Sequence, residues 1–152
     1  MSRKTIAHGI GAGLLAGLAG TAAATASARL EARLRRRHAP PAHAEVARRT
    51  LGIEGFDSPR AEQRFATLAH WGYGAGWGAL HGLLRALGLG PRSATAAHYA
   101  AVWGGALVLL PSHDVVPPIF LRGRGEIAAE VWHNLLYAAA TGAAFEALAE
   151  DR

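Results

Sequence analysis

The sequence has no cysteine, and long parts of it carry almost no charge. Without cysteine the chain can form neither a disulfide framework nor a thiolate metal site. It also lacks a nucleophile elbow, a phosphate-binding loop and the paired carboxylates of a hydrolase, so no catalytic pattern predicts an enzyme. Alternation of polar and apolar residues with period two, which would indicate β-strands, is missing as well. These absences predict an all-α protein without a recognisable catalytic motif.

Charged residues gather in residues 29–64 and at the two ends, which leaves four apolar stretches. A helix needs ~20 residues to cross a bilayer, and each stretch approaches or reaches that length. The 152 residues suffice for one domain. We therefore predict a single membrane domain over residues 1–152, a polytopic four-helix bundle with spans at about 6–28, 65–87, 94–116 and 127–148.

A soluble bundle and a cleaved signal peptide are the alternatives. A soluble bundle needs polar helix faces, but residues 6–28 offer only four polar side chains: His8, Thr21, Thr25 and Ser27. A signal peptide is suggested by residues 26–28, which read Ala-Ser-Ala and have the form of a cleavage site. The arginine cluster Arg29–Arg37 follows at once and resists export, which favours a first span that stays in the membrane.

The same basic charge orients the chain. Residues 29–64 form an amphipathic, arginine-rich loop between the first two spans, and the positive-inside rule places this loop in the cytoplasm and both termini outside. The chain is expected to cross the membrane several times. Arg29–Arg37 would lie on anionic lipid headgroups, and nucleic acid is not an expected partner. A homo-oligomer is compatible with this pattern.

Glycines recur every four residues in the first two spans. Gly9, Gly13 and Gly17 share one helical face. The second span repeats the spacing with Gly74, Gly78 and Gly82. In lipid such faces let two helix backbones approach closely, whereas in water each glycine costs about 1 kcal/mol of helix stability relative to alanine. The pattern predicts that the two glycine faces pack against each other.

Ionisable residues stand where the last two apolar segments meet, in "LPSHDVVPPIFLRGRGEIAAEVWHNLLY" from Leu110 to Tyr137. Within the last segment the polar positions share one helical stripe: Glu126, Glu130, His133, Tyr137 and Thr141. Ionisable groups inside a membrane face the bundle or water. Sorted by depth, five side chains are expected to converge near the cytoplasmic interface: His70, His113, Asp114, Glu130 and His133.

Several chemistries suit such residues. Glu130-x-x-His133 with further imidazoles has the ligand types of a divalent metal site, although it is half of the paired motif of carboxylate-bridged bundles. Histidines beside carboxylates also suit proton sensing or relay. Haem, a less favoured cofactor, would need two imidazoles on facing helices at equal depth, either His81 with His98 or His70 with His113. Otherwise the polar pairs only hold the helices together, and His98 is an interfacial anchor.

Three ordered motifs in residues 66–137 resemble the YagU-like family of bacterial inner-membrane proteins. They are "HWGYGAGWGALHG" from His70, "HDVVPP" from His113 and "EVWHNLLY" from Glu130. The arginine-rich loop of the first third has no counterpart in that family. The resemblance implies a multi-pass protein of the bacterial inner (cytoplasmic) membrane with a polar histidine site. A link to acid resistance has been proposed for the family.

The expected function is a buried His/Glu site linked to protons or a metal ion, in a small transporter, sensor or stress protein. One alternative is a haem- or quinone-linked membrane electron carrier. The other is a non-catalytic structural subunit whose histidines stabilise the bundle.

Overall fold

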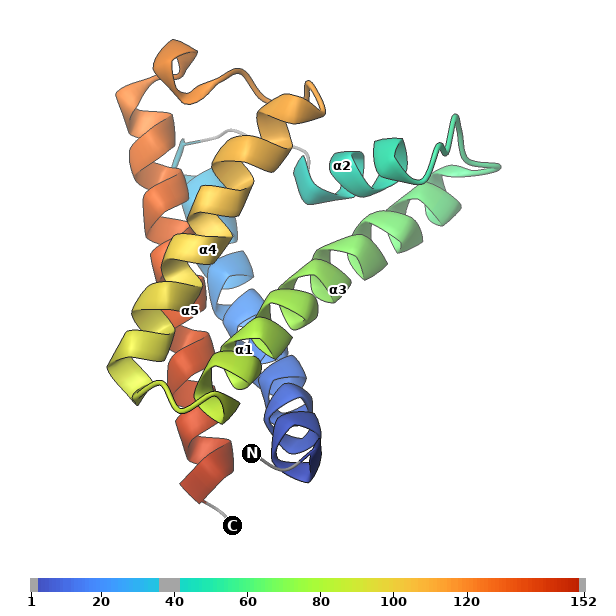
Figure 1. Ribbon diagram of the computed structural model, residues 1–152. Coiled ribbons are helices and arrows are strands. Elements are labelled where there is room, and N and C mark those ends of the chain that lie inside the picture. Colours follow the sequence, from blue (N-terminus) through green and yellow to red (C-terminus); the bar gives the residue numbers. More distant parts are fainter. Residues whose placement is uncertain (1–2, 36–41, 151–152) are drawn as a thin grey trace.

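A computed structural model describes residues 3–35 and 42–150, and these ranges contain no β-strand (Figure 1). The elements are α1 Arg3–Arg35, α2 Ala42–Thr50, α3 Pro59–Ala86, α4 Pro91–Ser112, the 3-10 turn η1 Ile119–Leu121 and α5 Arg124–Glu150. The all-α prediction is confirmed. The four long helices form the bundle, and the short α2, which lies inside the predicted basic loop, crosses one end of it (Figure 1).

Local capping explains where α3 and α4 begin. The Ser58 hydroxyl accepts the Ala61 N–H at 3.2 Å, and Pro59 supplies the fixed φ of a first helical position. Beyond the end of α3, Gly88 adopts a φ of 95°, which a residue with a side chain rarely does. Helix α4 then starts at Pro91 after the N-cap residue Gly90.

The helices are mostly longer than the predicted spans. Helix α1 continues to Arg35, because residues 29–35 are good helix formers despite their charge. Helices α3 and α5 likewise start several residues before the expected positions 65 and 127. Helix α4 ends at Ser112, before the predicted limit at residue 116, because Asp114 takes a left-handed φ of 52°. Because α1 is longer than the predicted span, its last turns can contact a histidine of α5.

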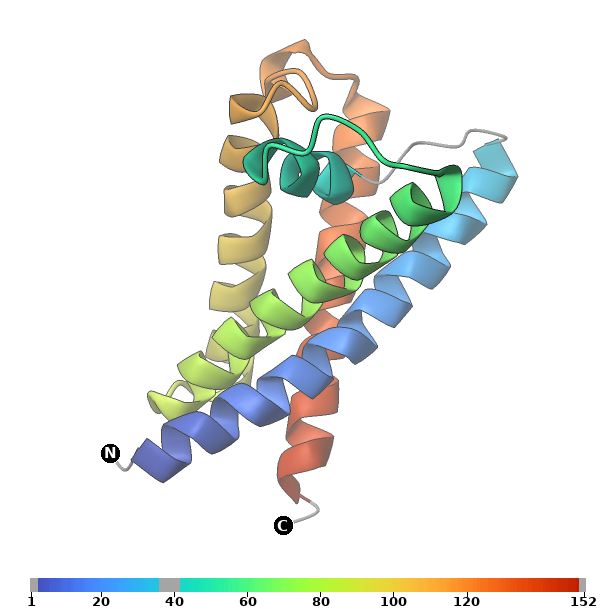
Figure 2. The ribbon, with the colours of Figure 1, turned by 90° about the vertical axis from the view of Figure 1, so that its right-hand side faces the viewer.

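The bundle has two distinct ends. The start of α1, the end of α5 and the α3–α4 turn lie together at one end, and α2 and η1 lie at the other (Figures 1 and 2). Within the described ranges, two helices are long and apolar enough to cross a membrane, α1 over Lys4–Leu34 and α4 over Pro91–Ser112.

The two glycine faces meet, as the sequence predicts. A Cβ placed on Gly13 would collide with the Gly78 carbonyl oxygen, and one placed on Gly78 would collide with that of Gly13. The same backbone contact joins Gly9 to Gly82, and a Cβ on Gly17 would lie 2.8 Å from the Gly78 Cα. Helices α1 and α3 therefore touch backbone to backbone, which only glycine permits.

Close contacts also involve α5, through two glycines that lie outside the two predicted glycine faces. A Cβ on Gly20 of α1 would lie 2.7 Å from the Tyr137 carbonyl oxygen and would collide with the Thr141 hydroxyl. A Cβ on Gly142 of α5 would collide with the Thr95 hydroxyl of α4. Small residues thus set the spacing between α1 and α5 and between α5 and α4.

Large apolar side chains lie mostly outside the bundle. The fully buried positions hold small or polar residues: Ala16, His81, Ala94, His98, Ala138 and Thr141. The most exposed large apolar residues stand on the outer surface or in η1: Leu34, Leu68, Val108, Phe120 and Leu121, at 69–80% exposure. A bundle that folds in water has the reverse distribution, with its leucines inside.

Candidate functional site

The five predicted site residues do not form one cluster. His70 Nε2 lies 2.8 Å from the Thr25 hydroxyl, and His133 Nε2 lies 2.6 Å from Glu31 Oε2. Both histidines therefore contact α1. Helix α1 packs between α3 and α5 and, because it extends to Arg35, carries Glu31 to the level of His133.

His113 and Glu130 have other partners. The His113 ring contacts the Thr50 hydroxyl at 3.2 Å, and Arg49 donates to the His113 carbonyl at 2.6 Å, which joins α2 to α4. Glu130 Oε2 lies 2.5 Å from an Arg122 guanidinium nitrogen. The predicted convergence is therefore wrong. In residues 3–35 and 42–150 no three His, Asp or Glu side chains come together in a way that could hold a metal ion.

A different polar site lies buried inside the bundle, in the half nearer the α3–α4 turn. His81 of α3 and His98 of α4 are both fully buried, and their ring centroids are 5.2 Å apart at 68°. Two rings of α5 flank the pair, Phe145 at 5.3 Å from His81 and Tyr137 at 5.4 Å from His98. The expectation that His98 is an interfacial anchor is wrong, because α5 covers it.

None of the four ring nitrogens of His81 and His98 has a hydrogen-bond partner among the described residues. The Trp77 carbonyl faces His98, but without the geometry of a hydrogen bond. A buried donor or acceptor left unpaired costs about 1–3 kcal/mol. Such groups are rare in native structures, and each one calls for a physical reason.

Charged groups lie on the side of the pair toward the α3–α4 turn. Arg85 Nε of α3 lies 2.8 Å from Glu146 Oε1 of α5, and both charges are within electrostatic reach of His81. On the opposite side the Tyr137 hydroxyl donates to the Gly74 carbonyl at 2.5 Å. Helix α1 has no ionisable residue between Lys4 and Arg29 except His8. The pair thus has one carboxylate, Glu146, as its neighbouring counter-charge.

The His81–His98 pair does not fit haem. Bis-imidazole ligation needs a porphyrin plane between the two rings, whereas these rings touch edge to face. His70 and His113 are bonded to hydroxyls of different helices, α1 and α2. The sequence did carry a signal for the pair, because His81 and His98 fall at equal depth when the spans are sorted.

Comparison with protein-family models, with curated proteins and with solved structures found no match. The resemblance to the YagU-like proteins stays a prediction.

Proposed function

We propose that the chain is a multi-pass protein of the bacterial cytoplasmic membrane whose buried His81–His98 pair binds and releases protons. The membrane placement is supported by the exposed leucines and by the small-residue contacts between the helices. Helices α3 and α5 have 28 and 27 residues, which at 1.5 Å per residue exceeds a hydrocarbon core of ~30 Å. Their polar residues His81, Tyr137 and Thr141 point inward.

The observation that carries the proton-binding role is the set of four unpaired ring nitrogens. If the histidines only stabilised the bundle, their nitrogens would be hydrogen-bonded to neighbouring helices. A neutral imidazole has one N–H and one free acceptor, so each ring can take up a proton. Ionisable groups inside a membrane bundle mark proton or substrate sites in other proteins.

Protonation has a mechanical consequence at this position. The pair stands at the contact between α3 and α4. In the part of the chain that the structure describes, Glu146 is the carboxylate that could stabilise a positive charge there, and Arg85 already neutralises it. Charging the rings would favour hydration of the pair and separation of the two helices. A fall in pH would in this way change the packing of α3 against α4. Such a change agrees with the acid-resistance link that the YagU-like resemblance implies.

The test measures the distance between spin labels on α3 and α4. Leu68→Cys and Val108→Cys place labels on two exposed side chains of a chain without other cysteines. In reconstituted protein the mean distance should lengthen by about 2 Å between pH 8 and pH 3.5, because a buried imidazole takes up its proton only in acid, and 2 Å is the size of helix shifts in known switches. His81→Gln and His98→Gln should each abolish the change.

His8→Gln is the matched control, because His8 lies on the exposed side of α1. It should leave the response intact. A response that persists in both His81→Gln and His98→Gln would assign the pair a purely structural role and overturn the proposal. So would an original protein whose label distance does not depend on pH.

A further inference from the structure

An apolar groove runs along the face of α3 that points away from α1. Two adjoining open depressions of about 390 and 380 Å³ share Gly72 and Tyr73. From α3 they are lined by residues spaced i, i+3, i+4, i+7, i+8 and i+11, which form one helical face: Ala69, Gly72, Tyr73, Gly76, Trp77 and Leu80. We call this feature the α2–α3 groove, because α2 closes one end of it.

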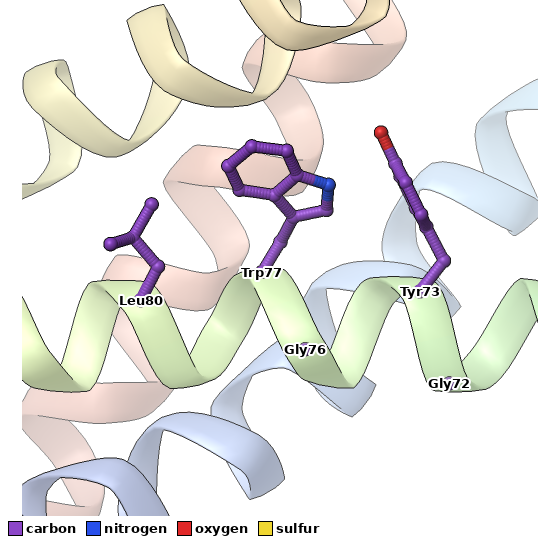
Figure 3. Close-up of a pocket in the computed structure, with 5 residues that line it drawn as sticks. All are labelled: Gly72, Tyr73, Gly76, Trp77 and Leu80. Atoms are coloured by element: carbon purple, nitrogen blue, oxygen red, sulfur yellow. The ribbon is translucent and has the colours of Figure 1, made fainter. Parts of the chain in front are cut away.

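Figure 3 shows Tyr73, Trp77 and Leu80 projecting from the same side of α3. The Trp77 ring reaches α4, where a Cβ on Gly105 would lie 3.1 Å from it. The groove therefore runs between α3 and α4. Its walls are aromatic and aliphatic carbon, which suits a hydrocarbon ligand better than a polar one.

Two glycines leave the floor of the groove open. A Cβ placed on Gly72 or Gly76 would meet no atom within 4 Å, in contrast to Gly74, Gly78 and Gly82 on the opposite face. Glycine inside a helix lowers helix stability, and here no helix contact explains it. The open space beside Gly72 and Gly76 can accommodate a ligand that packs against α3.

The length of the groove matches one lipid leaflet. From Ala69 to Leu80 the α3 axis rises ~16 Å at 1.5 Å per residue. This is about half of a ~30 Å hydrocarbon core. The α2 end belongs to the arginine-rich side of the proposed topology, so the groove would span the hydrocarbon half of the cytoplasmic leaflet.

Helix α2 carries charged residues just beyond the end of the groove that it closes. Its residues Val46, Thr50 and Leu51 line the cavity, and Glu45, Arg48 and Arg49 stand on the other side of the helix. One carboxylate pairs with two guanidinium groups at 2.7 Å each, so one positive charge remains in excess. An amphipathic helix of this kind lies in the interface, where cationic residues attract anionic headgroups.

We propose that the α2–α3 groove binds one acyl chain of an anionic phospholipid of the cytoplasmic leaflet, with the headgroup beside Arg48 and Arg49. The proposal rests on the membrane placement above and is independent of the histidine pair. The groove gives the chain a fixed lipid site, in which α2 contacts both the acyl chain and the headgroup.

The test uses native mass spectrometry of the full-length protein in mild detergent, with dioleoyl phosphatidylglycerol and dioleoyl phosphatidylcholine as probes. The original protein should hold one phosphatidylglycerol about tenfold more tightly than phosphatidylcholine. Gly76→Leu places a side chain in the groove, and its Cβ would meet no atom within 4 Å. It should weaken phosphatidylglycerol binding at least about tenfold, and Gly72→Leu should do the same.

The control is Gly11→Leu, which is also free of neighbours within 4 Å but lies on the exposed side of α1. It should bind phosphatidylglycerol as the original protein does.

Binding by both groove variants at the control level would overturn the proposal. Equal affinity for the two lipids would overturn the headgroup assignment. A dimer that both groove variants dissociate would show a second copy in the groove instead. His98→Gln should bind the lipid normally, which separates this result from the proton-binding role.

Discussion

Arg122 and Glu130 form an ion pair across the start of α5, with Nη2 and Oε2 2.5 Å apart. Their side chains are only 12% and 15% exposed, so each charge depends on the other. Removing one partner leaves a buried charge unpaired, and Glu130→Gln or Arg122→Gln should lower the free energy of unfolding by about 3 kcal/mol. Unfolding in mixed micelles measures this. The double variant Arg122→Glu/Glu130→Arg should recover part of the loss, and the exposed Glu126→Gln should change little. A Glu130→Gln variant with an unchanged free energy of unfolding would contradict the ion pair.

A second prediction compares two glycines of α3. Gly78→Leu inserts a side chain where even a Cβ meets the Gly13 carbonyl, so it should cost at least about 3 kcal/mol or block assembly. Gly76→Leu introduces the same side chain half a turn away, where there is free room. It should keep or raise the melting temperature. Thermal unfolding in detergent distinguishes the two. Equal melting temperatures would mean that α1 and α3 do not pack through this face in solution.

The orientation is tested with single cysteines, because the chain has none of its own. Gly55→Cys lies in the arginine-rich segment and Gly90→Cys in the α3–α4 turn, and neither position is crowded. In intact cells an impermeant maleimide should label Gly90→Cys at once. It should label Gly55→Cys only after the membrane is opened. The reverse pattern would contradict the orientation, and labelling of both in intact cells would contradict the four spans.

Glu45 provides a prediction about pH. Hydrogen bonds from Arg48 and Arg49 lower the pKa of Glu45 from 4.5 to about 2. A lowered carboxyl pKa means that the contribution of this ion pair to stability is complete above pH 4.5 and is lost as the pH falls through about 2. The α2 contacts should therefore persist at pH 4.

Carbon-13 NMR of the labelled Glu45 carboxyl measures this pKa directly. Arg48→Gln should raise it most, because the Arg48 hydrogen bond has the largest effect, and Arg49→Gln should raise it less. Arg92→Gln, at the other end of the bundle, should leave the titration unchanged. A Glu45 carboxyl that titrates near 4.5 in the original protein would show that the pairs do not form.

The glycine interface could be predicted from the sequence because a four-residue spacing fixes one face of a helix whatever its surroundings. Gly9, Gly13 and Gly17 had to point the same way, and so did Gly74, Gly78 and Gly82. The predicted second span begins at residue 65, but the capping residues Ser58 and Pro59 mark the earlier start of α3, because capping is a local property.

The histidine contacts could not be predicted in the same way. Depth along the membrane axis places His70, His113 and His133 at one level, but it does not say which helix lies beside each. That depends on how the helices cross, and α3 leans away from α4 toward the α2 end (Figure 1). The predicted first span also ends at residue 28, whereas α1 continues to Arg35, so the apolar pattern does not point to Glu31 as the partner of His133.

The backbone contact between α1 and α3 also limits how the molecule can move. No layer of side chains separates these helices, so a slide by one residue would drive Ala12 or Leu14 into the carbonyl groups of α3. The two helices therefore keep their register and move as one rigid body. Because Gly20 also holds α5 close to α1, a change of shape has to come from α4 tilting against the other helices, with the short α3–α4 turn as the pivot.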